Sequence, residues 1–254
     1  MTDLSAHHAV ITGGGTGVGA AIAKALSDAG ALVTLAGRRD GPIQAVAETL
    51  PRAQAIVCDV TDEASVEALF EKAAASFGPV TIAVANAGAA ESAPFGRIDL
   101  AAWDRMMAVN LTGAFLTARA ALGPMRKAKA GRILFVASTA GLKGYAYVAP
   151  YCAAKHGVVG LTRALAVEVA RDGVTVNAVC PGFTETPLLQ ESIANIMEKT
   201  GRDEAEARAE LSKGNPQGRF IQPEEVAETV LWLCSEGARS VTGQAISVSG
   251  GETQ

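Results

Sequence analysis

Short apolar runs alternate along the chain with longer segments in which apolar residues recur every three or four positions. Seven runs predict strands, namely Ala9–Thr12, Ala31–Ala36, Ala53–Val57, Val80–Ala85, Arg132–Ala137, Val174–Val179 and Ala245–Val248. The segments between them predict helices at Gly17–Asp28, Pro42–Leu50, Asp62–Phe77, Leu100–Leu122, Pro150–Arg171 and Pro223–Cys234. Strands that alternate with helices are parallel, and helices cover both faces of their sheet. The pattern therefore predicts an α/β fold with a doubly wound, parallel, seven-stranded sheet.

One long segment departs from this alternation. Thr184–Gly218 lies between a strand end and the next helix and is charged in its second half. An insertion in this position is typical of a lid. Because 254 residues fit one α/β domain, we expect a single domain over residues 1–254, with residues 184–218 as a lid insertion within it.

Composition narrows the classes of function. The net charge of −4 and the scattered basic residues form no stripe that could neutralise phosphates, so we expect no nucleic-acid partner. The four cysteines lie far apart, and only three histidines are available as co-ligands, which indicates buried thiols in a reducing compartment and no metal site. Met1–Ser5 lacks the features of a secretory signal, and the uncharged stretch Ala73–Ala90 is broken by Gly78-Pro79 and Asn86. We therefore expect a cytoplasmic protein with no membrane span.

A glycine-rich segment directly follows the first predicted strand and opens the first helix. It reads Thr12-Gly13-Gly14-Gly15-Thr16-Gly17-Val18-Gly19. Glycines permit a positive φ and let the backbone approach a pyrophosphate, whose charge is held at the helix N-terminus. The segment could be only a flexible turn, but its position and the absence of a Gly-Lys pair favour a dinucleotide over a P-loop. We expect Gly13, Thr16, Gly17, Val18 and Gly19 to bind the cofactor of a Rossmann-type domain.

The end of the second strand bears on the choice between NAD and NADP. An acidic residue there would bind the ribose 2′-hydroxyl, but Gly37 occupies that position and Arg38 and Arg39 follow it. Guanidinium groups suit a 2′-phosphate in charge and geometry. Both arginines could instead be solvated surface residues, and Asp40 could turn back to a ribose. We favour NADP, with NAD as the alternative.

Tyr151 and Lys155 lie four residues apart just after Pro150, a residue that favours the first turn of a helix. A phenol is a poor base at neutral pH, and an ammonium one turn away stabilises its phenolate. The same spacing also occurs on ordinary amphipathic helices. Tyr145 and Tyr147 have no lysine four residues on, so Tyr151 is our candidate proton donor and acceptor.

Two further polar residues lie where chemistry is expected. Ser138 follows the strand that ends at Ala137, on the edge of a parallel sheet where ligands bind, although it could simply form a turn. Asn110 is an unfavourable residue for the interior of the long predicted helix, which indicates a kink or a water site. Alone, neither residue would identify a site.

In their order, these motifs resemble the short-chain dehydrogenase/reductase family, from Thr12 to the closing Val241-Thr242-Gly243-Gln244 and Ser249-Gly250-Gly251. The resemblance implies a catalytic tetrad of Asn110, Ser138, Tyr151 and Lys155. It implies cofactor contacts at Asp59 and Val60 beside the adenine, Asn86 and Gly88 in a supporting loop, and Pro181, Gly182, Thr184 and Thr186 beside the nicotinamide. It also implies that Ser138 holds a carbonyl oxygen, Tyr151 donates its proton and Asn110 positions a water.

The resemblance implies an NADP(H)-dependent oxidoreductase that interconverts a ketone and a secondary alcohol. Within the family, Ala149–Leu188 and Gly218–Pro223 are similar to 3-oxoacyl thioester and polyketide ketoreductases, which suggests a 3-oxoacyl or 3-hydroxyacyl thioester or a related small ketone. An NAD-dependent alcohol or hydroxyacyl dehydrogenase and a non-catalytic dinucleotide sensor are alternatives. A serine hydrolase is disfavoured because no Gly-x-Ser-x-Gly motif is present. Substrate identity lies in Ala89–Arg97, Leu142–Val148 and the lid.

Two predicted helices carry more small and apolar residues than one face against a sheet needs. These residues are Ala114, Ala118, Ala121 and Leu122 on one helix, and Val158, Leu161, Leu165 and Val169 on the other. Unless all of them pack inward, a monomer would expose them. Together with the family resemblance, this predicts a homotetramer.

Overall fold

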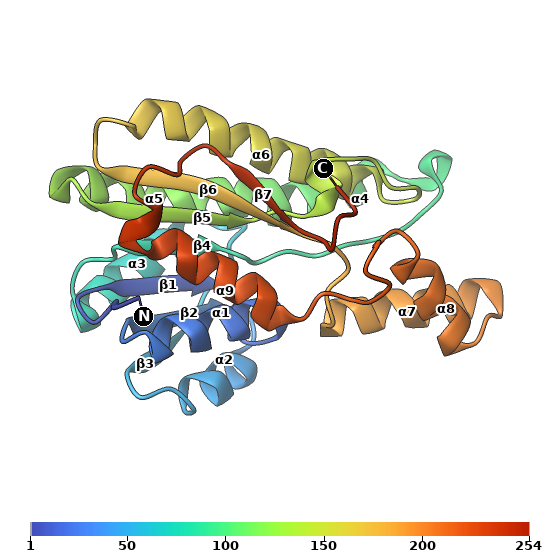
Figure 1. Ribbon diagram of the computed structural model, residues 1–254, viewed down its shortest axis with the longest axis horizontal. Helices are drawn as coiled ribbons and strands as arrows, with labels where there is room; N and C mark the ends of the chain where they lie inside the picture. Colours follow the sequence, from blue (N-terminus) through green and yellow to red (C-terminus); the bar gives the residue numbers. More distant parts are fainter. Residues whose placement is uncertain (1, 254) are drawn as a thin grey trace.

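The computed structural model describes residues 2–253, and a parallel sheet runs through the middle of the molecule (Figure 1). Its strands are β1 (His8–Thr12), β2 (Leu32–Gly37), β3 (Ala53–Val57), β4 (Ile82–Ala85), β5 (Gly131–Val136), β6 (Val174–Pro181) and β7 (Ala245–Val248). They lie in the order β3-β2-β1-β4-β5-β6-β7, and every neighbouring pair is parallel. The predicted seven-stranded, doubly wound sheet is confirmed, with strand ends shifted by at most two residues.

The helices are α1 (Gly17–Asp28), α2 (Asp40–Ala47), α3 (Glu63–Phe77), α4 (Leu100–Met107), α5 (Gly113–Ala128), α6 (Ala149–Val169), α7 (Pro187–Thr200), α8 (Glu204–Ser212) and α9 (Pro223–Cys234). Two apolar cores lie between the sheet and six of these helices. One core lies under α1, α2 and α9, and the other lies under α3, α5 and α6. Each strand serves both cores, because successive side chains point to opposite faces. On β5, for example, Ile133 and Phe135 enter one core and Leu134 and Val136 the other.

The long helix predicted over Leu100–Leu122 is divided. A π-helical turn at Ala108–Thr112 separates α4 from α5, and within it the backbone N–H of Gly113 donates to the carbonyl of Ala108 five residues back. Asn110 lies in this turn, so the α-helical pattern is interrupted at the residue that the sequence marked as unfavourable for a helix interior. The prediction of an end at Leu122 is wrong, since α5 continues through Pro124 to Ala128. Proline loses one hydrogen bond there, but the packing of α5 against β4 and β5 outweighs that loss.

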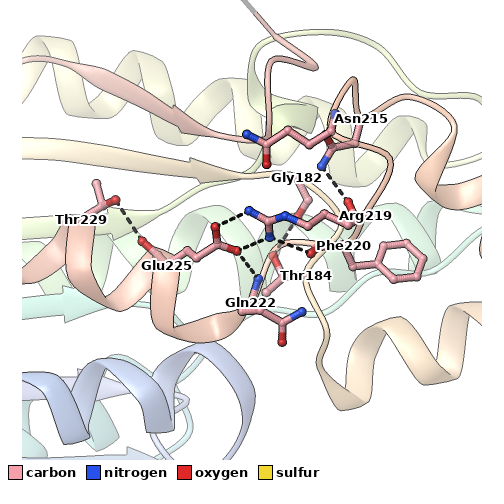
Figure 2. Close-up of polar contacts among 9 residues, drawn as sticks. Gly182, Thr184, Asn215, Arg219, Phe220, Gln222, Glu225 and Thr229 are labelled. Carbon is pink, nitrogen blue, oxygen red and sulfur yellow. Dashed lines mark hydrogen bonds and ion pairs between the residues drawn. The ribbon is translucent and has the colours of Figure 1, made fainter.

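The segment Thr184–Gly218 folds into α7 and α8, which stand apart from the sheet at the right of Figure 1. A small apolar cluster of Leu189, Ile193, Ala207 and Phe220 holds the two helices together. The chain then returns to the sheet through a polar junction shown in Figure 2. There the Arg219 guanidinium forms two bonds to the Glu225 carboxylate, at 2.6 and 2.7 Å, and Glu225 also accepts from the backbone N–H of Gln222 at 2.7 Å.

The eight small and apolar residues of α5 and α6 that the sequence predicted to be exposed in a monomer do not form an exposed face. Five of the eight are buried, namely Ala114, Ala118, Ala121, Val158 and Val169. The other three, Leu122, Leu161 and Leu165, are partly buried against the same core. This part of the prediction is wrong, because α5 and α6 pack both on the sheet and on each other, so each uses a wide apolar face.

No helix within residues 2–253 is long and apolar enough to cross a membrane. In the same part of the chain, no group of three or more His, Cys, Asp or Glu residues is placed to hold a metal ion. Cys58, Cys180 and Cys234 are buried and Cys152 is half-buried, and all four are free thiols.

Candidate active site

The cofactor-side motifs meet where the strand order reverses, between β1 and β4. The Asn86 side chain, just beyond β4, donates to the carbonyls of Thr12 and Gly13 at 2.9 and 3.1 Å. The Thr12 hydroxyl in turn accepts from the backbone N–H groups of Asn86 and Ala87. These bonds join the ends of β1 and β4 at the crevice where open parallel sheets bind dinucleotides. Thr12 was not among the predicted site residues, although it begins the glycine-rich segment.

The glycine-rich turn needs its glycines for shape. Gly13 and Gly17 have φ values of 66° and 52°, a region that favours glycine. A Cβ at Gly19 would lie 2.2 Å from the Gly13 carbonyl oxygen. In the described part of the chain no side chain caps α1, and its first turn holds no acidic residue. The open N–H groups of this helix end, with the exposed Thr16 beside them, suit a pyrophosphate.

The residues predicted at the adenosine end lie together. Arg38 and Arg39 are exposed at the carboxyl end of β2, and Arg38 is close enough to Asp59 to affect its charge. Hydrogen bonds from the backbone and hydroxyl of Thr61 hold the pKa of Asp59 below its usual range. Asp40 lies in the first turn of α2, near the Gln44 amide. Both guanidiniums are therefore exposed to solvent at this end of the sheet. The side chain of Val60 is buried against Gly113, which leaves its backbone for an adenine contact.

The loop after β6 reaches across to the glycine-rich turn. Gly182 donates its N–H to Val248 on β7 at 3.0 Å, and the Thr184 hydroxyl donates to the Gly182 carbonyl at 2.9 Å. Thr186 caps the N-terminus of α7, and a Cβ at Gly17 would lie 3.0 Å from the Thr186 methyl group. The predicted nicotinamide-side residues therefore border the same crevice as the phosphate turn.

Tyr151 and Lys155 lie in the first turns of α6, beside the carboxyl end of β5. Lys155 is 4% exposed, its ammonium donates to the Val136 carbonyl at 2.8 Å, and it lies 5.6 Å from the centre of the Tyr151 ring. Burial lowers the pKa of Lys155 to about 8. Burial also raises the pKa of Tyr151, and a hydrogen bond with Ser138 opposes that rise. Contrary to the expectation that Lys155 lowers it, the pKa of this phenol is raised, and burial is the main cause.

Ser138 lies at the end of β5, where a short 3₁₀ turn (η3, Thr139–Gly141) begins. Its hydroxyl caps this turn by accepting from the backbone N–H of Ala140 at 3.1 Å. The turn holds the serine hydroxyl close enough to Tyr151 to lower the pKa of the phenol, against the effect of burial. A carbonyl oxygen placed between the two hydroxyls would accept a hydrogen bond from each.

Asn110 is the fourth member of the predicted tetrad, and it is 1% exposed. Its amide donates to the carbonyls of Ala89 and Met106, and its oxygen accepts from the Ala89 backbone N–H at 3.2 Å. A Cβ at Gly88 would lie 2.9 Å from that oxygen and 3.7 Å from the Lys155 nitrogen. The Asn110 side chain therefore ties the loop after β4 to the π-helical turn, next to Lys155.

The three segments predicted to recognise substrate also meet. Asn195 on α7 donates to the Ser92 hydroxyl at 2.8 Å, which joins the segment predicted as a lid to the β4–α4 loop (Ala89–Arg97). Ala93 of that loop donates its N–H to the carbonyl of Tyr147, which lies in the substrate loop (Leu142–Val148), at 2.8 Å. The ring of Tyr145 in the substrate loop meets Phe183 edge-on, with centroids 6.0 Å apart. Sequence reasoning missed Ser92 and Asn195 because their contact spans 103 residues.

This sheet, its glycine turn and the grouping of a serine, a tyrosine and a lysine at the end of β5 define a class, the nicotinamide-dependent oxidoreductases. The family model described as enoyl-(acyl carrier protein) reductase matches residues 13–253, and the chain belongs to the short-chain dehydrogenase/reductase family.

Three relatives illustrate the similarity. The chain is 42% identical to cis-4-hydroxycyclohexanecarboxylate dehydrogenase of Sinomonas cyclohexanicum, over 96% of both chains. It is 39% identical to D-beta-hydroxybutyrate dehydrogenase of Cupriavidus necator, over 98% of both. The crystal structure of a single-residue variant of actinorhodin polyketide ketoreductase with NADPH superposes with a TM-score of 0.94 at 36% identity, over 99% of both chains. The chain is therefore an oxidoreductase that acts on hydroxyl or keto groups.

Proposed function

We propose that this protein interconverts a ketone and a secondary alcohol with NADP(H), on a 3-oxoacyl or 3-hydroxyacyl thioester or a related small ketone. The observation that carries the proposal is the placement of Ser138, Tyr151 and Lys155 at the end of β5, beside the crevice between β1 and β4. A non-catalytic dinucleotide sensor would need only the crevice that binds the cofactor, and none of these three side chains.

The proposed roles are those that the family resemblance implies, and the geometry supports them. The bound cofactor supplies or accepts the hydride at its nicotinamide. Ser138 holds the carbonyl oxygen, and Tyr151 donates its proton to that oxygen in the reducing direction. The buried ammonium of Lys155 stabilises the phenolate that remains and also binds the nicotinamide ribose. Asn110 holds Gly88 and Ala89 beside Lys155 and positions the water through which the phenolate regains its proton.

The residues of the crevice fit a dinucleotide phosphate. The open N-terminus of α1 and the glycine turn would hold the pyrophosphate, and the exposed Arg38 and Arg39 would hold a 2′-phosphate. The ketoreductase of similar structure was crystallised with NADPH, which supports the same choice here. An NAD-dependent dehydrogenase is the second candidate, favoured only by the proximity of Asp59 to Arg38, which reduces the local positive charge.

The names of the relatives indicate the range of substrates on which similar enzymes act. They include enzymes of an alicyclic alcohol, a short hydroxy acid and a polyketide ketone. All three carry a secondary hydroxyl or its ketone, and this supports the reaction more strongly than any one substrate.

A cytoplasmic homotetramer is part of the proposal. Free thiols at all four cysteines support a reducing compartment. Large apolar side chains that a single chain leaves exposed support assembly, namely Trp103 on α4, Phe115 on α5, Val167 on α6 and Trp232 on α9. Light scattering at micromolar concentration is the test, and a mass near the monomer's 25.9 kDa would contradict the assembly.

The decisive experiment incubates the purified protein with NADPH or NADH and follows loss of the reduced nicotinamide band. The panel contains cyclic ketones, ethyl acetoacetate and a 3-oxoacyl thioester. We expect turnover with NADPH on at least one of them. Cofactor binding without any turnover would favour the sensor, and faster turnover with NADH would favour the second candidate.

A further inference from the structure

Glu252, near the C-terminal end of the chain, places a carboxylate inside the molecule. Its side chain is 3% exposed. One of its oxygens accepts from the Tyr145 hydroxyl at 2.6 Å and lies 3.0 Å from the ammonium of Lys143. Both partners belong to the substrate loop. The roles described above make no use of this carboxylate, and a buried charge is stable only when it is paired in this way.

Two glycines make room for the carboxylate. A Cβ at Gly182, in the loop after β6, would lie 3.2 Å from one carboxylate oxygen. A Cβ at Gly214, at the end of the lid, would lie 2.9 Å from the other. The preceding Gly250 packs against the Asn215 side chain in the same way. Glu252 therefore lies between the nicotinamide-side loop, the lid and the substrate loop.

A chain of hydrogen bonds connects Glu252 to the short turn Thr139–Gly141 (η3) that follows Ser138. Tyr145 has one proton, which it donates to the carboxylate, so the Thr139 hydroxyl 2.6 Å away donates to the phenol oxygen. Burial raises the pKa of Tyr145, and the bond to Glu252 raises it further, which keeps the phenol protonated. Thr139 directly follows Ser138. The carboxylate thus fixes the wall of the site beside the serine that holds the carbonyl oxygen.

The positive charge of Lys143 is paired with the Glu252 carboxylate and the Tyr145 ring. Its ammonium lies between the Glu252 carboxylate and the Tyr145 ring, 4.9 Å from the ring centre. On the β4–α4 loop, which bonds to the substrate loop through Ala93, Glu91 pairs with Arg105 in the same manner at 3.1 Å. In each pair a neighbouring carboxylate offsets the positive charge, which weakens its attraction for a substrate carboxylate.

We propose that Glu252 is a positioning residue that determines specificity: by pairing with Lys143 and Tyr145 it adapts the cleft to carbonyl compounds without a free carboxylate, such as esters, thioesters or neutral ketones. The inference rests on the proposed reductase function and narrows its substrate class. Neutralising Glu252 leaves the Lys143 ammonium of the substrate loop without its carboxylate partner, and the unpaired charge attracts an anionic substrate.

The test compares two probes that differ only in charge, acetoacetate and ethyl acetoacetate. Wild type, Glu252→Gln, the double variant Lys143→Gln/Glu252→Gln and the control Glu224→Gln on the surface of α9 are assayed with NADPH. We expect wild type to prefer the ester. Glu252→Gln shifts the acid-to-ester ratio of kcat/KM toward the acid by about tenfold, the usual effect of a hydrogen bond to a charged group. The double variant and the control keep the wild-type ratio.

Three results would overturn the inference. They are a wild-type preference for acetoacetate, an unchanged ratio in Glu252→Gln, or a double variant that loses acetoacetate turnover, which would show that Lys143 already binds the carboxylate. If Glu252→Gln does not fold, the comparison of the neutral double variant with wild type still decides. Calorimetric binding of acetoacetate with NADP present separates the two hypotheses. Tighter binding by Glu252→Gln supports the charge argument even if no variant turns over, a result that would contradict the reductase function alone.

Discussion

The two halves of the crevice are built by different means. On the cofactor side, most of the parts are backbone groups and residues near them in sequence: glycines in a turn, an uncapped helix end, and arginines at the end of the adjacent strand. One side chain, that of Asn86, reaches the turn from 73 residues away. On the substrate side, three segments are joined by single side-chain contacts across about a hundred residues, such as Asn195 with Ser92 and Tyr145 with Glu252.

The difference shows how one scaffold can keep its cofactor while its substrate changes. A turn that depends on backbone geometry tolerates few replacements, because a Cβ in the wrong place collides with main-chain atoms. A wall held by side-chain hydrogen bonds can be rebuilt by a few substitutions that leave the sheet intact. The turn that follows Ser138 contacts the substrate side through the bond between Thr139 and Tyr145.

The largest effect is expected at the chemistry itself. Tyr151→Phe keeps the ring and removes the proton, so kcat should fall by about 10²- to 10⁴-fold, the range for general acid catalysis. Binding of NADPH, measured by fluorescence titration, should be unchanged. Activity within about tenfold of wild type, below the usual range for such a group, would show that another residue donates the proton.

The second-largest effect is expected when a methyl group is added to the glycine-rich segment, because the methyl group should weaken cofactor binding. In Gly19→Ala the added carbon would lie 2.2 Å from the Gly13 carbonyl oxygen. Relieving such an overlap costs about 1–3 kcal/mol, so we expect NADPH affinity to fall by roughly 10- to 100-fold. Gly160→Ala on α6 is the matched control, since no atom lies within 4 Å of its added carbon. Equal cofactor affinity in the two variants would mean that the turn adapts freely.

The choice of cofactor should depend on Arg38. A guanidinium bonded to a phosphate contributes about 1.5–3 kcal/mol, so Arg38→Ala should weaken NADPH binding by about tenfold or more and leave NADH binding nearly unchanged. Calorimetric titration of both cofactors gives the comparison, and Arg39→Ala shows which arginine bears the phosphate. Equal weakening of NADH and NADPH would assign Arg38 to the ribose instead.

On the substrate side, the contact between lid and loop should have a smaller effect. Ser92→Ala removes one hydrogen bond, from Asn195, worth about 1 kcal/mol, so KM should rise by roughly fivefold with kcat nearly unchanged. The control is Ser192→Ala, whose hydroxyl bonds only within α7. If both variants behave like wild type, the lid does not close on the β4–α4 loop during turnover.

The smallest effect concerns the polar junction where the chain leaves the lid (Figure 2). The bond from Arg219 lowers the pKa of Glu225 from 4.5 to about 2. A lowered pKa stabilises the fold above the unfolded value of 4.5, and this contribution is lost as the pH falls toward 2. The pair is partly exposed, so Glu225→Gln should cost only about 0.5 kcal/mol at pH 7, with the difference shrinking below pH 4.5. Urea unfolding at several pH values measures it, with the exposed Glu228→Gln as control.

The sequence alone determined the sheet, because apolar strands and amphipathic helices carry their own periodicity. It also determined the cofactor turn and the pair of Tyr151 and Lys155, since each depends on residues only a few positions apart. Helix ends were less certain: α5 continues through Pro124, because packing against the sheet outweighs the loss of one backbone hydrogen bond.

Only the tertiary structure decided which residues of the lid and loops meet. It placed Glu252 against Tyr145, which is 107 positions away, and it buried the apolar residues of α5 and α6 that the sequence had suggested were surplus. It also showed that Lys155 donates to the Val136 carbonyl, and that burial raises the pKa of Tyr151. Such contacts depend on how separate elements pack, and the pattern of one segment holds no record of which distant side chain will lie against it.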